Sequence, residues 1–249
     1  MTPEQLTTDF GNLFIGIDNK YGQLTGYGKE VKANGKREKL TVIKDGAPPV
    51  HDHLSGVNKF SIGTFPFVSN TTVKWGCIDI DEYQITDLHW KLVRQLKELE
   101  INNAIVDRSA SGGAHIWFFF EKPVNADHLR KKLKNIGEAL RYKYEIFPKQ
   151  PSINLPNNIG NFVYLPYHNG FNKPLQIAYG DDGKYMNLEK FINIAKDKQI
   201  KSLKELRVPK ATKQNEPETD ADETPIEIVD ADTDIGELLK EGPVCLEEA

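Results

Sequence analysis

The sequence predicts an α+β fold built on a mixed or mostly antiparallel sheet. Apolar runs typical of strands and segments with apolar residues at helical spacing alternate along the chain, but without a regular period. A regular alternation would instead favour a parallel, doubly wound sheet. No internal repeat is visible. With 249 residues, 39% hydrophobic and 10% aromatic, the chain can form one sizeable domain with additions, or two small ones.

Capping residues and helical spacing predict the helices. Thr2 with Pro3 at the first helical position begins one helix, and Thr86 caps a second with its apolar residues between Leu88 and Leu99. Asn125 caps a third, whose other face is rich in lysine, and Asn187 caps a last short one. Between the helices we expect strands at residues 73–80, 101–106, 116–120, 161–165 and 176–178, and loops or hairpins over residues 16–49.

Composition excludes several classes of protein. No apolar run approaches the roughly 20 residues of a membrane span, and the N-terminus has no basic segment followed by an apolar one, as a secretory signal would. Two cysteines, Cys77 and Cys245, cannot form a disulfide framework. The sequence is therefore expected to belong to a cytoplasmic protein without a membrane partner.

Charge divides the chain into two parts. From Lys210 onward there are three basic and thirteen acidic residues, a balance of −10, which leaves +6 of the overall −4 for residues 1–209. A modestly basic body is compatible with a polyanionic partner, although many enzymes without one have the same charge.

Two aspartates two positions apart end the most apolar strand, residues 73–80. Side chains at i and i+2 of a strand point to the same face, so Asp79 and Asp81 would project together, about 7 Å apart along the strand. Carboxylates this close repel each other unless a cation lies between them, and Mg²⁺ or Mn²⁺ prefers such oxygen ligands. A metal-dependent phosphoryl-transfer site is one interpretation, and a strand running into an acidic turn is the other.

Three further clusters carry groups of chemical interest. Residues 108–115 form a turn of small residues between strands, in which backbone N–H groups, hydroxyls and charge could bind a phosphate; a plain hairpin is the alternative. Its candidate ligands are Arg108, Ser109, Ser111, Gly112 and His115. In residues 144–150, Glu145 is a candidate third metal ligand and Lys149 could meet a triphosphate, or both could be exposed at a strand end. Residues 160–168 contain Asn161 and mean little alone.

The order of these clusters resembles the archaeo-eukaryotic primase superfamily, closest to the primase-polymerases of phages, plasmids and bacterial conflict systems. The resemblance covers about residues 10–180: Asp-x-Asp, Ser-Gly-Gly-Ala-His before a strand, Glu-Ile-Phe-Pro-Lys-Gln, then Gly-Asn-x-x-x-Leu-Pro. The stretches 53–56 and 62–66 also resemble the lead into the first motif. The family fold has an RRM-like catalytic sheet with an additional α/β subdomain beside it.

The resemblance implies the roles of individual residues. Asp79 and Asp81 would bind metal, with Glu145 as the third ligand where the family usually has aspartate. His115 would contact the phosphates of the incoming nucleotide, with Ser109 or Ser111 as hydroxyl partner. Relatives often carry a zinc knuckle before the first motif, but residues 35–49 contain no cysteine, so no zinc is expected there.

The leading functional hypothesis is therefore a template-dependent DNA primase or polymerase of a phage or mobile element. It would use two Mg²⁺ or Mn²⁺ ions, and its partners would be a single-stranded DNA template, a primer strand and deoxynucleoside or ribonucleoside triphosphates. The alternative is a rolling-circle (HUH-type) nuclease with His51-Asp52-His53 as its histidine pair and Tyr142 or Tyr144, on a helix, as nucleophile. A third possibility, an inactive nucleic-acid-binding subunit, is disfavoured by the intact Asp79, Asp81 and His115.

The C-terminal part of the sequence predicts a boundary. Residues 1–208 would form the catalytic domain, residues 209–234 an acidic and disordered linker, and residues 235–249 the start of a helical domain missing here. That domain helps to hold the initiating nucleotide in relatives, so we expect this chain to extend primers but to start new strands poorly. A helicase could be a further partner of the full-length protein, and a native acidic tail is the alternative to this interpretation.

Overall fold

The computed structural model describes residues 1–31 and 37–209. Capping residues begin several of the helices in this part of the chain. The side chains of Thr2, Asn125 and Asn187 accept hydrogen bonds from the first turns of their helices, as predicted. The third helix begins after Asp87, one residue later than predicted, and no side chain caps it. The described helices are α1 Pro3–Leu13, α2 Val50–Ser55, α3 Leu88–Glu98, α4 Ala126–Leu140 and α5 Leu188–Asp197.

The strands in the described part of the chain form two sheets, and the strand pairings that define both sheets are antiparallel. This mixed α/β architecture with antiparallel sheets confirms the coarse fold prediction and is consistent with an archaeo-eukaryotic primase domain. The smaller sheet has the order β2-β1-β3-β8, with β1 Lys20–Val31, β2 Arg37–Asp45, β3 Ile62–Thr64 and β8 Val163–Tyr164. The larger sheet has the order β7-β4-β6-β5-β9, with β7 Tyr144–Phe147, β4 Thr72–Ile80, β6 Ala114–Asn125, β5 Ala104–Arg108 and β9 Ala178–Tyr179.

Several strand boundaries differ from the prediction. The segment predicted as 101–106 starts at Ala104, because the backbone N–H of Ile101 still bonds to the carbonyl of Leu96 and closes α3. The strand predicted at 116–120 extends over Ala114–Asn125, whereas the one at 161–165 shortens to two residues. Periodicity locates such elements but does not fix their ends.

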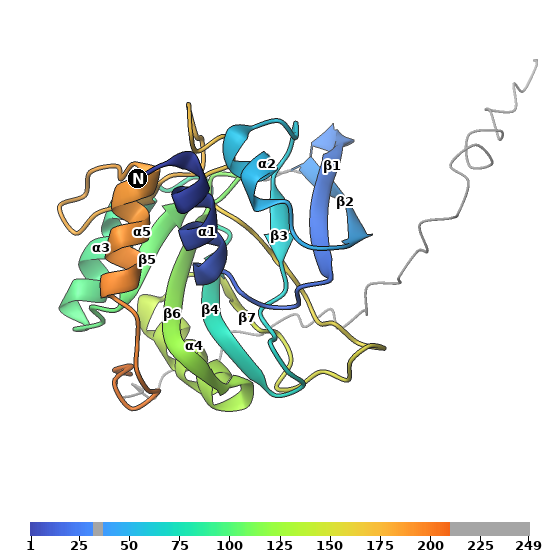
Figure 1. Cartoon of the computed structure of the whole chain (residues 1–249). Coiled ribbons are helices and arrows are strands. Elements are labelled where there is room, and N and C mark those ends of the chain that lie inside the picture. The colour runs from blue at the N-terminus through green and yellow to red at the C-terminus, as the bar shows by residue number, and fades with distance from the viewer. Residues whose placement is uncertain (32–36, 210–249) are drawn as a thin grey trace, which may run out of the picture. The chain divides into compact units, whose positions relative to one another are not determined.

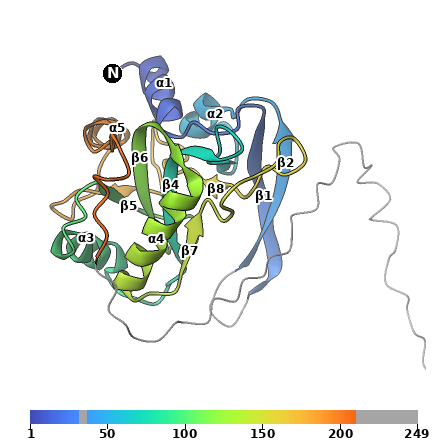
Figure 2. The same cartoon turned by 90° about the horizontal axis from the view of Figure 1, so that it is seen from below.

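The larger sheet is covered on both faces. Helices α3 and α4 lie on one face, and α1 and α5 on the other (Figures 1 and 2). Alternation along β4 divides its side chains accordingly: Ile78 and Ile80 belong to the core beneath α3 and α4, while Trp75 and Cys77 belong to the core with α1 and α5. Asp79 therefore projects from the same face as Trp75 and Cys77.

No helix in residues 1–31 and 37–209 is long and apolar enough to cross a bilayer. Apart from Pro209, the predicted linker and the predicted start of a C-terminal domain lie outside the described residues.

Candidate active site

Four ionisable residues form one row across four strands of the larger sheet. Asp79 on β4 pairs in register with Glu145 on β7 and with His115 on β6, and His115 pairs with Asp107 on β5. Directly opposed residues of antiparallel strands send their side chains to the same face. The row Glu145–Asp79–His115–Asp107 therefore lies on the face from which Trp117 also projects.

Asp79 has the features of a cation ligand. Its Oδ1 is buried and accepts no hydrogen bond, while 23% of the side chain remains exposed. Burial raises the pKa of Asp79, and the charges of Asp81 and Glu145 act in the same direction, against those of His115 and Lys39. Ionisation of a partly buried carboxylate beside two other acids is unfavourable, because the charge is poorly solvated and is repelled by its neighbours. A bound divalent cation would compensate both effects. The oxygen of Asp79 that accepts no hydrogen bond is therefore chemically suited to a hard divalent cation.

The other two predicted metal ligands bind protein partners. Asp81, just beyond the end of β4, accepts a short hydrogen bond from the hydroxyl of Tyr83. Glu145 lies 3.1 Å from Nζ of Lys149, and half of its side chain is exposed. As these side chains stand, no group of three or more His, Cys, Asp or Glu within the described ranges is arranged to hold a metal ion. Glu145 would have to exchange Lys149 for a cation, which its exposure permits.

His115 is held between two carboxylates. Its Nδ1 lies 3.2 Å from Oδ1 of Asp107 and its Nε2 lies 3.9 Å from Oδ1 of Asp79, and only 4% of the residue is exposed. The Nδ1 contact does not meet hydrogen-bond geometry and is an ion pair. Burial lowers the pKa of His115, but the charges of Asp107 and Asp79 outweigh it, so the net shift is upward. The upward shift favours the imidazolium form, which is suited to a phosphate.

The turn between β5 and β6 packs tightly against the end of β4. A Cβ on Gly113 would lie 2.4 Å from the carbonyl oxygen of Ile80, and Gly112 has a φ of +98°, so both positions require glycine. The N–H of Gly112 bonds to the carbonyl of Ser109, and the hydroxyls of Ser109 and Ser111 are 3.5 Å apart. The turn is therefore fixed against the end of β4, the strand that Asp81 directly follows.

Other predicted nucleotide ligands are not brought into the row. Arg108 pairs with Ala114 and so projects from the opposite face to His115, with its guanidinium near Gly112. Asn161 accepts a hydrogen bond from the amide of Gln150, at 2.7 Å. Lys149 reaches the row only through Glu145.

Sequence reasoning missed two residues of the site. Asp107 is fully buried beside His115 on the neighbouring strand, and its place directly after the apolar run Ala104–Val106 does not by itself indicate this burial. Lys39 on β2 brings a positive charge from the smaller sheet that acts on both Asp79 and His115, and its Nζ lies 5.0 Å from the ring centroid of Tyr164. Nothing in the sequence around Lys39 indicates this role.

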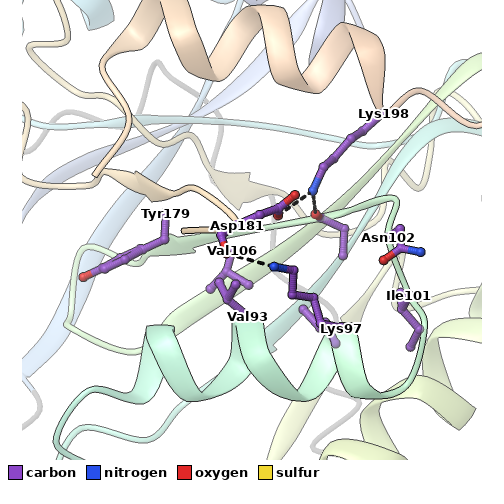
Figure 3. Close-up of a pocket in the computed structure, with 10 residues that line it drawn as sticks. Val93, Lys97, Ile101, Asn102, Val106, Tyr179, Asp181 and Lys198 are labelled. Atoms are coloured by element: carbon purple, nitrogen blue, oxygen red, sulfur yellow. Dashed lines mark hydrogen bonds and ion pairs between the residues drawn. The ribbon is translucent and has the colours of Figure 1, made fainter. Parts of the chain in front are cut away.

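A hollow between α3, β5 and β9 lies on the other side of the sheet (Figure 3). Val106 lines it and alternates with Asp107, so the hollow and the row face opposite ways. Nζ of Lys97 donates to the backbone carbonyl of Asp181 there, and Nζ of Lys198 donates to the Asp181 carboxylate. Both ammonium groups thus have partners within the protein, and the row Glu145–Asp79–His115–Asp107 is the better candidate for the active site.

Comparison with known families decides the identity of the domain. Residues 25–211 match the family described as the archaeo-eukaryotic primase domain of TOTE conflict systems. The chain belongs to this family. Membership of this family suggests an activity of the primase or polymerase type and implies nucleic-acid and nucleotide substrates. Domains of this family generally use divalent metals. The whole row from Asp79 to Glu145 lies inside the matched region of this primase domain. A comparison with curated proteins gave no match.

The rolling-circle alternative does not fit the geometry of the primase domain. His51 and His53 lie on the helix α2, where residues two apart point to different sides. His53 is fully buried, and its ring nitrogens contact the carbonyl of Pro166, at 2.7 Å, and the N–H of Ile62. Neither candidate tyrosine is helical, since α4 ends at Leu140 and Tyr144 begins β7. His53 is therefore a structural residue, and His51 is exposed on another side of α2.

Proposed function

We propose that this primase domain is a template-dependent nucleotidyltransferase that adds nucleotides to a 3′-hydroxyl. The observation that carries the proposal is the buried Oδ1 of Asp79, which accepts no hydrogen bond and lies on a strand between Glu145 on one side and His115 on the other. Such a row offers oxygen ligands for a cation next to a cationic group for a phosphate. The family match supports the same assignment.

Asp79, Asp81 and Glu145 would hold two Mg²⁺ or Mn²⁺ ions. When bound, such ions align an attacking 3′-oxygen with the α-phosphorus and stabilise the charge of the in-line displacement. For Glu145 to contribute, its carboxylate must leave Lys149, which becomes free to meet the triphosphate. One exchange of partners would then create both a metal ligand and a phosphate ligand.

His115 would neutralise the triphosphate through Nε2, the ring nitrogen that faces Asp79. Ser109, Ser111 and Gly112 would contribute hydroxyl and N–H donors, with Arg108 and Asn161 as outer contacts. In the reaction, a bond forms between the 3′-oxygen and the α-phosphorus, and the bond to the β-phosphate bridging oxygen breaks. Pyrophosphate leaves with the electron pair, and the proton of the 3′-hydroxyl passes to solvent.

The two sheets would have different roles in the reaction. We assign catalysis to the larger sheet as the RRM-like element of residues 1–208, with the smaller sheet as the additional subdomain. The charge of Lys39, which acts on Asp79 and His115 from β2, supports a site formed by both sheets. Template and primer would approach from the side on which the row is exposed, at Glu145.

A primer-extension assay tests the proposal. Wild-type protein is mixed with an annealed primer, and separately with an unprimed single-stranded template, with each nucleotide type and with Mg²⁺ or Mn²⁺. We expect primer extension that requires the metal and is abolished in Asp79→Ala and in Asp81→Ala. Glu98→Gln is the matched control, because it removes an exposed acid of α3 whose ion-pair partner among the described residues is Arg94. Extension at the wild-type rate by either aspartate variant would refute the assignment.

A further inference from the structure

Asp107 is a carboxylate at a buried position, where an ionised side chain is energetically unfavourable. It is fully buried in the middle of the larger sheet, between Val106 and Arg108. Transferring an ionised carboxylate out of water costs several kcal/mol unless partners compensate it. We therefore expect Asp107 to stabilise or orient the side chains that contact it.

The neighbours of Asp107 are few and specific. Its Oδ1 accepts a hydrogen bond of 2.9 Å from Nε1 of Trp117 and lies 3.2 Å from Nδ1 of His115. Its Oδ2 is buried and accepts no hydrogen bond. Among the described residues, the ionisable group that contacts this carboxylate is the imidazole of His115. The Trp117 N–H fixes the carboxylate, and the carboxylate in turn faces one nitrogen of the imidazole.

This arrangement determines where the other nitrogen of His115 points. With Nδ1 directed at Asp107 on β5, the ring presents Nε2 toward Asp79 on β4, where a nucleotide phosphate would arrive. The Trp117 ring, 5.3 Å away and inclined by 67°, limits rotation of the imidazole from one side. Without Asp107 the ring could turn about its Cβ–Cγ bond, and Nε2 would lose its fixed direction.

We propose that Asp107 is a positioning residue that orients His115 toward the triphosphate of the incoming nucleotide, with Trp117 holding Asp107 in turn. The inference rests on the proposed nucleotide site, because the ring is oriented toward a phosphate only if a nucleotide binds there. Asp107 itself touches neither nucleotide nor metal. Its removal should therefore act through His115 alone.

The test compares Asp107→Ala, Asp107→Asn and His115→Ala, alone and combined, in the binding of a non-hydrolysable deoxynucleoside triphosphate analogue. We expect Asp107→Ala to weaken binding of the analogue roughly tenfold, as the loss of one charge-assisted hydrogen bond would. Asp107→Asn keeps an oxygen that accepts from Trp117 and faces Nδ1 of His115, although without the negative charge, and should restore part of the loss. In the His115→Ala background, Asp107→Ala should add nothing, and template affinity should not change.

Ser61→Ala is the matched control, since it breaks another buried hydrogen bond, 3.1 Å to Gln176, away from the row. Equal losses in single and double backgrounds, or a parallel loss of template affinity, would overturn the positioning role. If Asp107→Ala does not fold, the same cycle is measured with Asp107→Asn, for which a loss that persists without His115 is the refuting result.

A second readout separates this inference from the proposed function. In metal-free wild-type protein, the proton on Nδ1 of His115 should be protected from exchange and visible by ¹H–¹⁵N NMR, and it should disappear in Asp107→Ala. A signal that persists unchanged in the variant overturns the role of Asp107. If the wild type binds no nucleotide while the proton responds as expected, the proposed function fails and the orientation of His115 by Asp107 stands.

Discussion

Asp79→Asn should make the metal-free protein more stable. The substitution keeps the shape of the side chain but removes a charge whose Oδ1 is buried and which lies opposite Glu145. Like charges directly opposed across antiparallel strands destabilise the sheet, where favourable cross-strand pairs contribute about 0.2–1 kcal/mol, and relief of the desolvated charge adds to the gain. The lost attraction to Nε2 of His115, at 3.9 Å, offsets part of the gain.

The raised pKa of Asp79, caused first by burial, shows that the ionised form is disfavoured overall. We therefore expect a net gain of about 1 kcal/mol, which corresponds to a rise in Tm of roughly 2–4 °C for a domain of this size. A group whose folded pKa is raised stabilises the fold below its unfolded pKa and loses this contribution as pH rises through the folded pKa. The gain in Asp79→Asn should accordingly grow from about pH 4 upward.

The assay is thermal unfolding in EDTA and in Mn²⁺. An ion at 100 times its dissociation constant stabilises the wild type by about 2.7 kcal/mol, or roughly 5–10 °C. Asp79→Asn should lose most of this increase together with nucleotide incorporation. A variant that melts below the wild type in EDTA at neutral pH, or that gains as much from Mn²⁺, would refute the reasoning.

Three other substitutions give independent tests. His115→Ala should raise the apparent Michaelis constant for nucleotide at least roughly tenfold while the dissociation constant for template stays constant, because the lost contact is charge-assisted; a change confined to template affinity would move His115 out of the nucleotide site. His53→Gln should reduce the pH dependence of the free energy of unfolding. Burial lowers the pKa of His53 to about 4. The wild type therefore loses up to about 3 kcal/mol of stability as pH falls from about 6.5 to about 4. His51→Gln, on the exposed side of α2, is the control, and equal pH slopes in both variants would contradict the argument. Glu145→Gln should increase the Mn²⁺ concentration needed for half-maximal incorporation, and an unchanged metal requirement would exclude Glu145 as a ligand.

The local parts of the site were predictable from the sequence. Asp79 at the end of an apolar run, and glycines before His115, are patterns whose meaning depends on neighbours within a few residues. The caps at Thr2, Asn125 and Asn187 are local in the same sense, since each side chain bonds to the N–H three residues later.

The register that assembles the site was not predictable. Glu145 meets Asp79, and Asp107 meets His115, only because β7, β4, β6 and β5 pair in that order. A shift of one residue in any of these pairings would send a member of the row to the other face, and no single strand encodes that choice. Asp107 was missed for this reason: beside Arg108 at the end of a strand it resembles an exposed acid, and only the pairing with β6 shows that it is buried.

The most direct test of the central claim is a crystal structure with Mn²⁺ and a non-hydrolysable nucleoside triphosphate. The account predicts anomalous density for Mn²⁺ at the carboxylates of Asp79 and Asp81, Glu145 turned away from Lys149, and a phosphate oxygen at Nε2 of His115. Manganese absent from Asp79, or a nucleotide bound on the opposite face of the sheet beside Val106 and Tyr179, would contradict it.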